Sequence, residues 1–203
     1  MEKIETIGIE WGAAFVVSPG QKESGDKPLV KTFPDGVLVA VVDGIGHGNE
    51  AGEAAKAALR TLESRAHEPV ISLIQRCHEN LRTTRGVVMS LASFDLVHGL
   101  MTWLGVGNVE GILLRPNPGR TIVLGSLLLR SGVIGAQLPT LQAAVLPVAR
   151  MDTLIFATDG VRADFLRGFI PSGPPQRTAE RILAEGGKGT DDALVLAARY
   201  IGL

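Results

Sequence analysis

Four acidic positions in this chain share the same surroundings: each stands at the end or the start of an apolar stretch, beside Gly, Ser or Thr. They are Asp26 in Ser-Gly-Asp, Asp43 in Val-Val-Asp-Gly, Asp159 in Ala-Thr-Asp-Gly, and the pair Asp191-Asp192 in Gly-Thr-Asp-Asp. A single Asp-Gly is a common turn signal, but this recurrence predicts carboxylates that converge on one site. Carboxylates that converge in a partly dry site repel one another, and a bound cation is the usual remedy.

The residue types point to a hard divalent cation and to phosphate chemistry. Carboxylate oxygens suit Mg²⁺ or Mn²⁺ rather than Zn²⁺, and the chain has no His/Cys cluster at zinc spacing. A glycine after the carboxylate, as at Gly44, lets the backbone approach a metal and offer its carbonyl. We therefore expect a two-metal centre whose bridging hydroxide attacks a phosphate ester. Such hydrolysis needs no Ser or Cys nucleophile, and no Gly-x-Ser-x-Gly elbow is present.

Apolar runs and glycine-rich turns predict the elements that would carry these carboxylates. Strands are predicted at 7–17, 36–43, 87–96, 99–106, 110–115, 121–124, 152–157 and 193–198. Helical spacing of apolar residues predicts helices at 50–66, 69–83 and 176–185. Polar residues predict a loop at 21–28, and the strands between 87 and 115 have the spacing of a β-meander.

Length and composition indicate one globular domain. The chain has 203 residues, 45% of them hydrophobic, and no linker long enough to divide it, so we expect a single domain over 1–203. Antiparallel-looking strands around helices indicate the α+β class. Few aromatic residues are available for the core, and Trp11, Trp103 and Cys77 are interpreted as core or sheet-face residues rather than as ligands or a nucleophile.

Charge and hydropathy exclude several classes of protein. Lys plus Arg is 20 and Asp plus Glu is 21, a net charge of −1, which argues against a nucleic-acid binder. The most apolar stretch, 121–149, is broken by glycines and prolines, so it does not predict a membrane span. Residues 1–5 lack the basic and apolar regions of a signal peptide, so we expect a cytoplasmic protein. The glycine-rich loop at 44–48 lacks the Lys-Ser/Thr ending of a P-loop.

The motifs resemble a known family when they are taken in order. Ser-Gly-Asp, Val-Val-Asp-Gly-Ile-Gly-His-Gly, Ala-Thr-Asp-Gly-Val and Thr-Asp-Asp-Ala-Leu-Val-Leu resemble the metal-dependent serine/threonine protein phosphatases of the PPM, or protein phosphatase 2C, type. Within that family the chain is most similar to the bacterial SpoIIE-like branch and its stressosome phosphatases. The resemblance covers residues 20–200, and the stretches 75–78, 84–87, 105–109 and 131–134 support it.

The resemblance implies a four-layer α-β-β-α sandwich of two antiparallel sheets flanked by helical pairs, with the metals at one edge between the sheets. Asp43 would bridge both metals, and the carbonyl of Gly44 would ligate one of them. Asp159 and Asp191 would complete the same centre, and Asp26 would hold the other metal directly or through water. Asp43 and Asp159 are therefore also the expected catalytic carboxylates.

Two further residues have open roles. Asp192 either ligates metal or orients Asp191 from behind it. His47 either contacts substrate or acts as an acid toward the leaving oxygen, and the alternative is a solvated turn residue. The chain departs from the family pattern at Lys27, where relatives tend to have a small or neutral residue, and it has no obvious early Arg to clamp phosphate.

The implied activity is hydrolysis of phosphoserine or phosphothreonine with Mn²⁺ or Mg²⁺. The implied partners are phosphorylated stressosome proteins with STAS domains, both scaffold and antagonist subunits, whose dephosphorylation resets stress signalling. We expect a monomer that binds neither nucleic acid nor membrane. Two alternatives remain: a catalytically idle docking module of phosphatase fold, and a metal-dependent phosphoesterase for small molecules. A docking module without activity would not need to keep like charges clustered, which argues against the first alternative.

Overall fold

The computed structural model describes residues 5, 6, 8–21, 23–165 and 171–202. The opening residues 1–4, Ile7 of the predicted first strand and Lys22 of the predicted polar loop lie outside this part. In chain order the elements are β1 (Glu5–Thr6), β2 (Ile9–Val16), β3 (Asp26–Phe33), β4 (Gly36–Gly44), α1 (Asn49–Ser64), α2 (Val70–Asn80), β5 (Val87–Asp95), β6 (Leu100–Val106), β7 (Glu110–Asn117), β8 (Arg120–Ser126), β9 (Leu129–Arg130), β10 (Ala144–Pro147), β11 (Thr153–Ala157), α3 (Pro175–Gly186) and β12 (Ala193–Tyr200).

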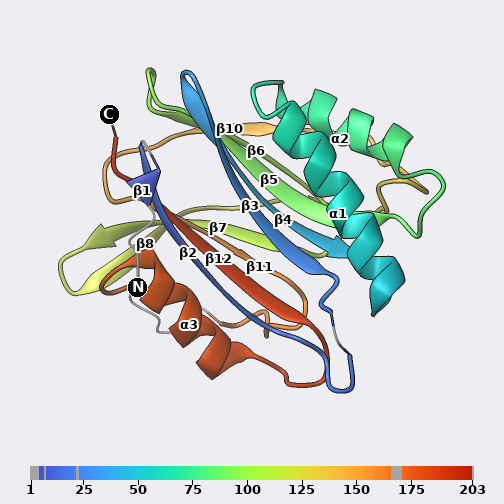
Figure 1. Ribbon diagram of the computed structural model, residues 1–203. Coiled ribbons are helices and arrows are strands. Elements are labelled where there is room, and N and C mark those ends of the chain that lie inside the picture. The colour runs from blue at the N-terminus through green and yellow to red at the C-terminus, as the bar shows by residue number, and fades with distance from the viewer. Residues whose placement is uncertain (1–4, 7, 22, 166–170, 203) are drawn as a thin grey trace.

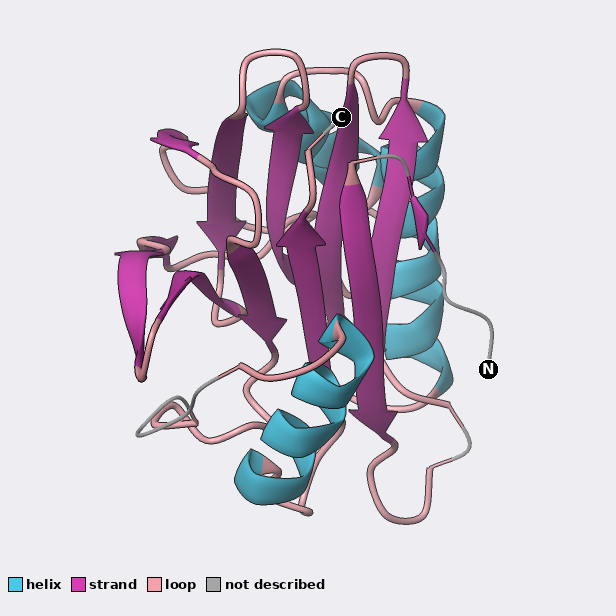
Figure 2. Cartoon of the chain, turned by 90° about the vertical axis from the view of Figure 1, so that its left-hand side faces the viewer, coloured by secondary structure: helices cyan, strands magenta, loops and turns pink. Residues whose placement is uncertain are grey.

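The strands form two sheets that pack face to face. Sheet A has the order β1-β2-β12-β11-β7-β8, and sheet B has the order β10-β6-β5-β4-β3. Neighbours along both sheets are antiparallel, and the short β9 adds to β6 in parallel. Helices α1 and α2 cover the outer face of sheet B, while α3 lies across the outer face of sheet A (Figure 1; Figure 2). The predicted α+β sandwich of four layers is confirmed.

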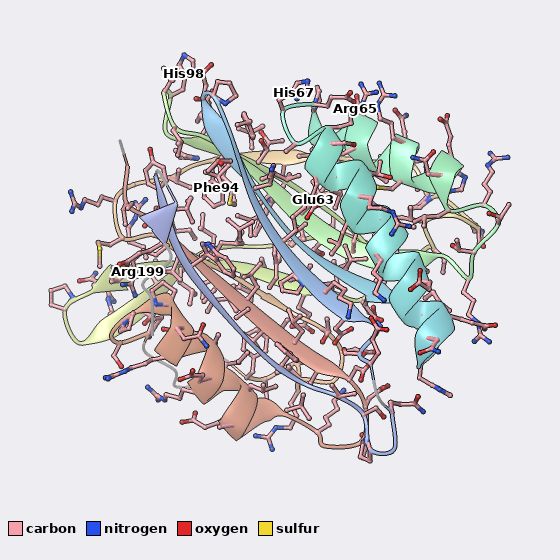
Figure 3. All side chains as sticks on the ribbon, viewed as in Figure 1. Glu63, Arg65, His67, Phe94, His98 and Arg199 are labelled. Atoms are coloured by element: carbon pink, nitrogen blue, oxygen red, sulfur yellow. The ribbon has the colours of Figure 1, made fainter. Side chains whose placement is uncertain are left out.

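Three apolar cores hold the layers together. The first lies between sheet B and the α1–α2 pair and includes Leu62, Ile74 and Cys77. The second lies between the two sheets, where Figure 3 shows Phe94 and where Trp103 is also buried. The third lies between sheet A and α3. The core roles predicted for the cysteine and for Trp103 are confirmed, and Trp11 packs partly buried against the second core.

The alternation of side chains along β4 explains both its continuous apolar run and the direction of the Asp43 side chain. Successive side chains of a strand point to opposite faces. Val37, Val39 and Val41 accordingly belong to the core between the sheets, while Leu38, Ala40 and Val42 face the helices. Both faces are buried, so the run needs no polar residue until its end. The alternation directs Asp43 toward the space between the sheets.

Three sequence predictions need correction. The loop predicted at 21–28 is too long, because β3 already begins at Asp26; Pro28 is tolerated there since β3 is the edge strand of sheet B. The meander predicted between 87 and 115 is broken, because β5 and β6 pair in sheet B whereas β7 joins sheet A. Only one helix, α3, covers sheet A in the described residues, instead of the expected pair.

No helix in the ranges that the structure describes combines the length and the apolar character needed to cross a bilayer. The stretch 121–149, which the sequence predicted not to span a membrane, forms β8, β9 and β10 with loops between them.

Candidate metal centre and active site

Two of the predicted carboxylates face each other across neighbouring strands. Asp26 begins β3 and Asp43 stands near the end of β4, and the antiparallel register pairs them directly. Side chains in such a pair point to the same face, here the space between the sheets. The Asp26 side chain is buried, and its charge raises the pKa of Asp43. Sheet B therefore contributes a pair of carboxylates at one end of the sandwich.

The other carboxylates come from sheet A. Asp159 follows the end of β11, and Asp191 precedes the start of β12, which is the neighbour of β11. The charges of both act on Asp43, as does the charge of Asp26. Asp26, Asp43, Asp159 and Asp191 thus all lie at the end of the sandwich where β4 and β11 stop, and their role as metal ligands stays a prediction.

Asp192 is held by the backbone. Its Oδ1 accepts a hydrogen bond from the Ser18 N–H at 2.7 Å, and its Oδ2 accepts one from the Gly25 N–H, also at 2.7 Å. The N–H of Asp192 in turn donates to Oδ1 of Asp191 at 2.8 Å. Both carboxylate oxygens are therefore used to fasten the 18–25 loop to sheet A. This favours the positioning role over metal ligation.

The surroundings of the paired carboxylates disfavour their ionised forms. Burial raises the pKa of Asp26 to about 7, with help from the charges of Asp192, Asp159 and Asp191 and against the hydrogen bond from Thr158, which lowers it. Burial also raises the pKa of Asp43 to about 8, and the neighbouring charges of Asp26, Asp159 and Asp191 add to it. A divalent cation between them would favour the ionised forms that these surroundings disfavour.

The donor set fits Mg²⁺ or Mn²⁺. Every clustered group offers oxygen, and no thiol or imidazole lies among the predicted ligands. In the described part of the chain, no group of three His, Cys, Asp or Glu side chains has the geometry to hold one metal ion. Mg²⁺ keeps several waters and uses one or two protein carboxylates, so an open arrangement of carboxylates suits it better than it suits a fully protein-ligated ion.

Gly44 and His47 are the two remaining predicted site residues, and Gly44 is buried whereas His47 is exposed. Gly44 is buried against α1, where a Cβ would lie 2.1 Å from the carbonyl oxygen of Ala51, so no larger residue fits beside Asp43. The Gly44 N–H donates to the Gly25 carbonyl at 3.2 Å, which ties the ends of β4 and of the preceding loop together. His47 is exposed in the bend between β4 and α1, and its role stays a prediction.

Four polar residues that the sequence did not assign to the site bond to the carboxylates or to the backbone of the acidic residues. The Asn108 amide donates to Oδ2 of Asp159 at 2.8 Å. The Thr158 hydroxyl donates to Oδ2 of Asp26 at 2.7 Å and accepts from the Leu194 N–H at 2.8 Å. The Ser24 hydroxyl accepts from the Asp26 N–H at 3.0 Å, and the Lys188 ammonium donates to the Asp159 carbonyl. Ser24 and Thr158 stand within two residues of predicted ligands, which was the available signal for them.

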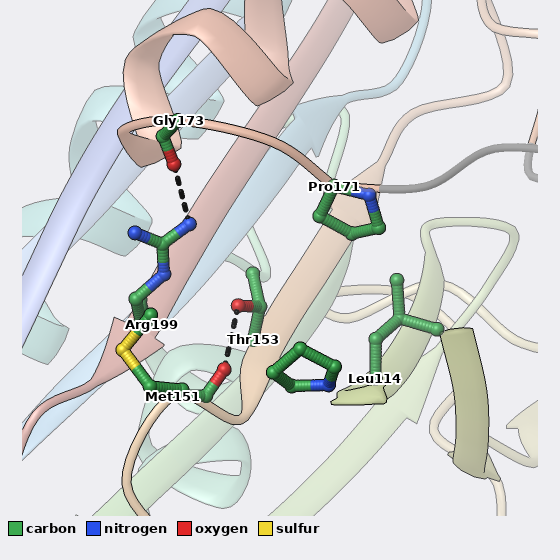
Figure 4. Close-up of a pocket in the computed structure, with 7 residues that line it drawn as sticks. Leu114, Met151, Thr153, Pro171, Gly173 and Arg199 are labelled. Carbon is green, nitrogen blue, oxygen red and sulfur yellow. Dashed lines mark hydrogen bonds between the residues drawn. The ribbon is translucent and has the colours of Figure 1, made fainter. Parts of the chain in front are cut away.

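A separate hollow of about 270 Å³ lies on the α3 side of sheet A (Figure 4). It is lined by Leu114, Pro116, Met151, Thr153, Pro171, Gly173 and Arg199. Arg199 donates to the Gly173 carbonyl at 2.6 Å and pairs with Glu10 at 3.4 Å. Thr153 begins β11 and Asp159 follows its end, so this hollow is at the opposite end of the sheet from the carboxylates.

Comparisons with known proteins agree with this geometry. Residues 34–201 match the protein family described as Stage II sporulation protein E (SpoIIE). The phosphoserine phosphatase RsbX of Bacillus subtilis (strain 168) is 33% identical over 98 residues, which are 48% of this chain and 49% of RsbX. The match therefore spans about half the length of that relative.

Two solved structures share the fold. A chain from the work "The bacterial stressosome: a modular system that has been adapted to control secondary messenger signaling" has a TM-score of 0.82 and 29% identity, covering 94% of this chain and 99% of that chain. The crystal structure of RsbX in complex with magnesium has a TM-score of 0.83 and 24% identity, covering 97% of each chain. The second likeness bears on the fold alone, and it agrees with the sandwich described above.

Proposed function

Because the chain belongs to the SpoIIE family of PP2C-type phosphatase domains, as its motifs predicted, we propose that it is a metal-dependent protein serine/threonine phosphatase. The observation that carries the proposal is the convergence of Asp26, Asp43, Asp159 and Asp191 at one end of the sandwich. Asp26 is buried and Asp43 is partly buried, and like charges so placed are costly unless a ligand compensates them, so the cluster is a feature of binding rather than of stability.

Asp26, Asp43, Asp159 and Asp191, with the Gly44 carbonyl, would hold two Mg²⁺ or Mn²⁺ ions. Such ions supply Lewis-acid chemistry: they neutralise charge on the phosphoryl oxygens and activate water. The protein supplies the positions. Asp43 lies between the two sheets, where it can serve both sites. A phosphate ester held at this centre would be hydrolysed directly by water, without a covalent intermediate on the protein.

The surrounding residues fix the orientation of the ligands. Asn108 holds Asp159, and Thr158 holds Asp26. Asp192 fastens the 18–25 loop that leads into Asp26. Outer partners of this kind raise the affinity and precision of metal sites. His47, exposed in the bend four residues after Asp43, would donate a proton to the leaving serine or threonine oxygen.

For the substrate, we propose phosphorylated STAS-domain proteins of the stressosome. The support is the 33% identity to the phosphoserine phosphatase RsbX and the likeness to a chain from a stressosome study. Release of phosphate from such subunits would return the signalling assembly to its resting state.

The test is phosphate release from a phosphoserine peptide and from p-nitrophenyl phosphate in Mn²⁺, in Mg²⁺ and in EDTA. Asp43→Asn should abolish metal-dependent release. Asp35→Asn, the same change in the exposed turn at the other end of β4, is the matched control and should retain activity. If the folded wild type releases no phosphate with either metal, the proposal is wrong for these substrates. The same assay on phosphorylated STAS proteins then separates a partner-dependent enzyme from an idle docking module.

A pH–rate profile tests His47 separately. If His47 is the acid, His47→Ala slows the reaction and removes one limb of the profile, and the loss is smaller for p-nitrophenyl phosphate, whose leaving group needs no proton. An unchanged rate and profile would eliminate the role.

A further inference from the structure

Arg85 stands beside the carboxylate cluster without a role in the metal site. Strand β5 pairs with β4 so that Val87 lies opposite Gly44. Beyond that pair the two chains stay together, because the Ile45 N–H donates to the Gly86 carbonyl at 3.1 Å. Arg85 therefore lies beside Gly46, only three residues from Asp43, which is at most about 10 Å of chain.

The turn that presents Arg85 is built by its neighbours. The Thr84 hydroxyl donates to the Leu81 carbonyl at 2.8 Å and accepts from the Gly86 N–H at 3.0 Å, which fixes the backbone on both sides of Arg85. On the other side, Gly46 has a φ of +94°, and a Cβ there would lie 2.8 Å from Nη1 of Arg85. Glycine at 46 thus leaves space for the guanidinium.

The guanidinium is available for a ligand. Its partner is the carboxylate of Glu50 at the start of α1, and both side chains are largely exposed, at 54% and 69%. Other basic groups around the cluster are more fully used: Lys27 and Lys56 both pair with Glu23, and the Lys188 ammonium donates to a backbone carbonyl. Arg85 also borders a hollow of about 420 Å³ together with Thr83, Thr84 and Asn49, which leaves room for a substrate chain.

The charge balance of the reaction calls for such a group. Bound metal ions would offset the clustered carboxylates, but a phosphoserine brings a further charge of nearly −2. A guanidinium binds phosphoryl oxygens through two parallel hydrogen bonds. We propose that Arg85 binds the phosphoryl group of the substrate, and that Glu50 competes with that group for the same guanidinium. This proposal rests on the phosphatase function proposed above.

The experiment measures steady-state kinetics on a phosphoserine peptide, with competitive inhibition by inorganic phosphate, at saturating Mg²⁺. Arg85→Ala should raise both KM and the phosphate inhibition constant about tenfold, the loss expected for a half-exposed charged hydrogen bond. Arg85→Lys should recover part of the loss. Arg82→Ala removes the same charge from an exposed position in the same loop and should change neither constant. Equal constants for wild type and Arg85→Ala would overturn the proposal.

Glu50→Gln tests the competition. It should lower the phosphate inhibition constant about twofold to fivefold, the range of an exposed ion pair. The gain should vanish when Arg85→Ala is also present, because it acts through that guanidinium. A gain that persists in the double variant, or no gain, would contradict the role of Glu50.

A second readout separates this inference from the proposed function. If the wild type shows no phosphatase activity, the proposed function fails. Binding of inorganic phosphate to the Mg²⁺-loaded protein is then measured by titration calorimetry. Binding that weakens about tenfold in Arg85→Ala, but not in Arg82→Ala, still supports Arg85 as the phosphate-binding residue. Equal binding by wild type and Arg85→Ala, or no binding by wild type, would refute it.

Discussion

Replacing Asp43 by Asn should stabilise the metal-free protein at pH 8 even though it removes a residue of the proposed active site. Asp43 and Asp26 lie side by side in buried surroundings, and burial raises the pKa of both above the ordinary value. Folding therefore takes up protons between about pH 4 and pH 8. The metal-free wild type loses stability as the pH rises through that window, because the folded carboxyl groups must then ionise next to each other.

The size of the effect follows from the pKa. A rise in the pKa of Asp43 from 3.8 to about 8 corresponds to a loss of about 6 kcal/mol in folding free energy when this carboxyl group is ionised in the folded protein at high pH. The substituted amide is still a buried polar group beside Asp26, so we take about 2–3 kcal/mol as the gain at pH 8. For a chain of this size that is a rise in Tm of about 4–10 °C.

The assay is thermal unfolding in EDTA at pH 5 and pH 8, followed by circular dichroism, with Asp35→Asn as the control. At pH 8 Asp43→Asn should melt above the wild type, and at pH 5 the difference should shrink toward zero because both carboxyl groups then hold protons. Added Mg²⁺ should reverse the order at pH 8, since the wild type gains more from the ion. If Asp43→Asn melts below the wild type by the same margin at both pH values in EDTA, the electrostatic reasoning is wrong.

Three further changes give distinct outcomes. Asn108→Ala frees Asp159, so kcat should fall between about tenfold and a hundredfold; an unchanged kcat would show that Asp159 needs no such support. Arg115→Ala leaves the buried Asp152 without its ion-pair partner, and urea unfolding should show a loss of about 1–3 kcal/mol with kcat unaltered, whereas a change in kcat alone would contradict this purely structural role. Burial raises the pKa of the Cys77 thiol to about 12, so iodoacetamide at pH 8 should label it only after unfolding, and rapid labelling of the folded protein would contradict its core position.

The sequence predicted the elements whose patterns are local. The unbroken apolar run of β4 and the helical spacing of α1 and α2 are properties of a few neighbouring residues, and these elements appear within a few residues of their predicted bounds. Strand β3 was missed, because Asp26-Lys27-Pro28 has a turn-like composition and the strand state of 26–33 depends on pairing with β4. Strand β7 pairs in sheet A rather than beside β6 in sheet B because of tertiary packing, which the spacing of strands along the sequence does not reveal.

For the site, the sequence supplied the carboxylates but not their supports. The four acidic motifs are recognisable because each follows or precedes an apolar run. The bond from Thr158 to Asp26 joins residues 132 positions apart, and the bond from Asn108 to Asp159 joins residues 51 apart. Asp192 could not be assigned from its neighbours, since its role is set by backbone N–H groups of a distant loop. Such contacts follow from packing, so only the folded chain reveals them.

Mn²⁺ binding is the most direct test of the central claim, that this carboxylate cluster is a metal centre. The measurement is a titration of metal-free protein with Mn²⁺, with the free ion followed by electron paramagnetic resonance. Wild type and Asp35→Asn should bind Mn²⁺ with equal affinity, and Asp43→Asn should bind it at least tenfold more weakly, with Asp159→Asn also weakened. Equal Mn²⁺ affinity in the wild type and in Asp43→Asn, or no Mn²⁺ binding by the folded wild type, would contradict the account.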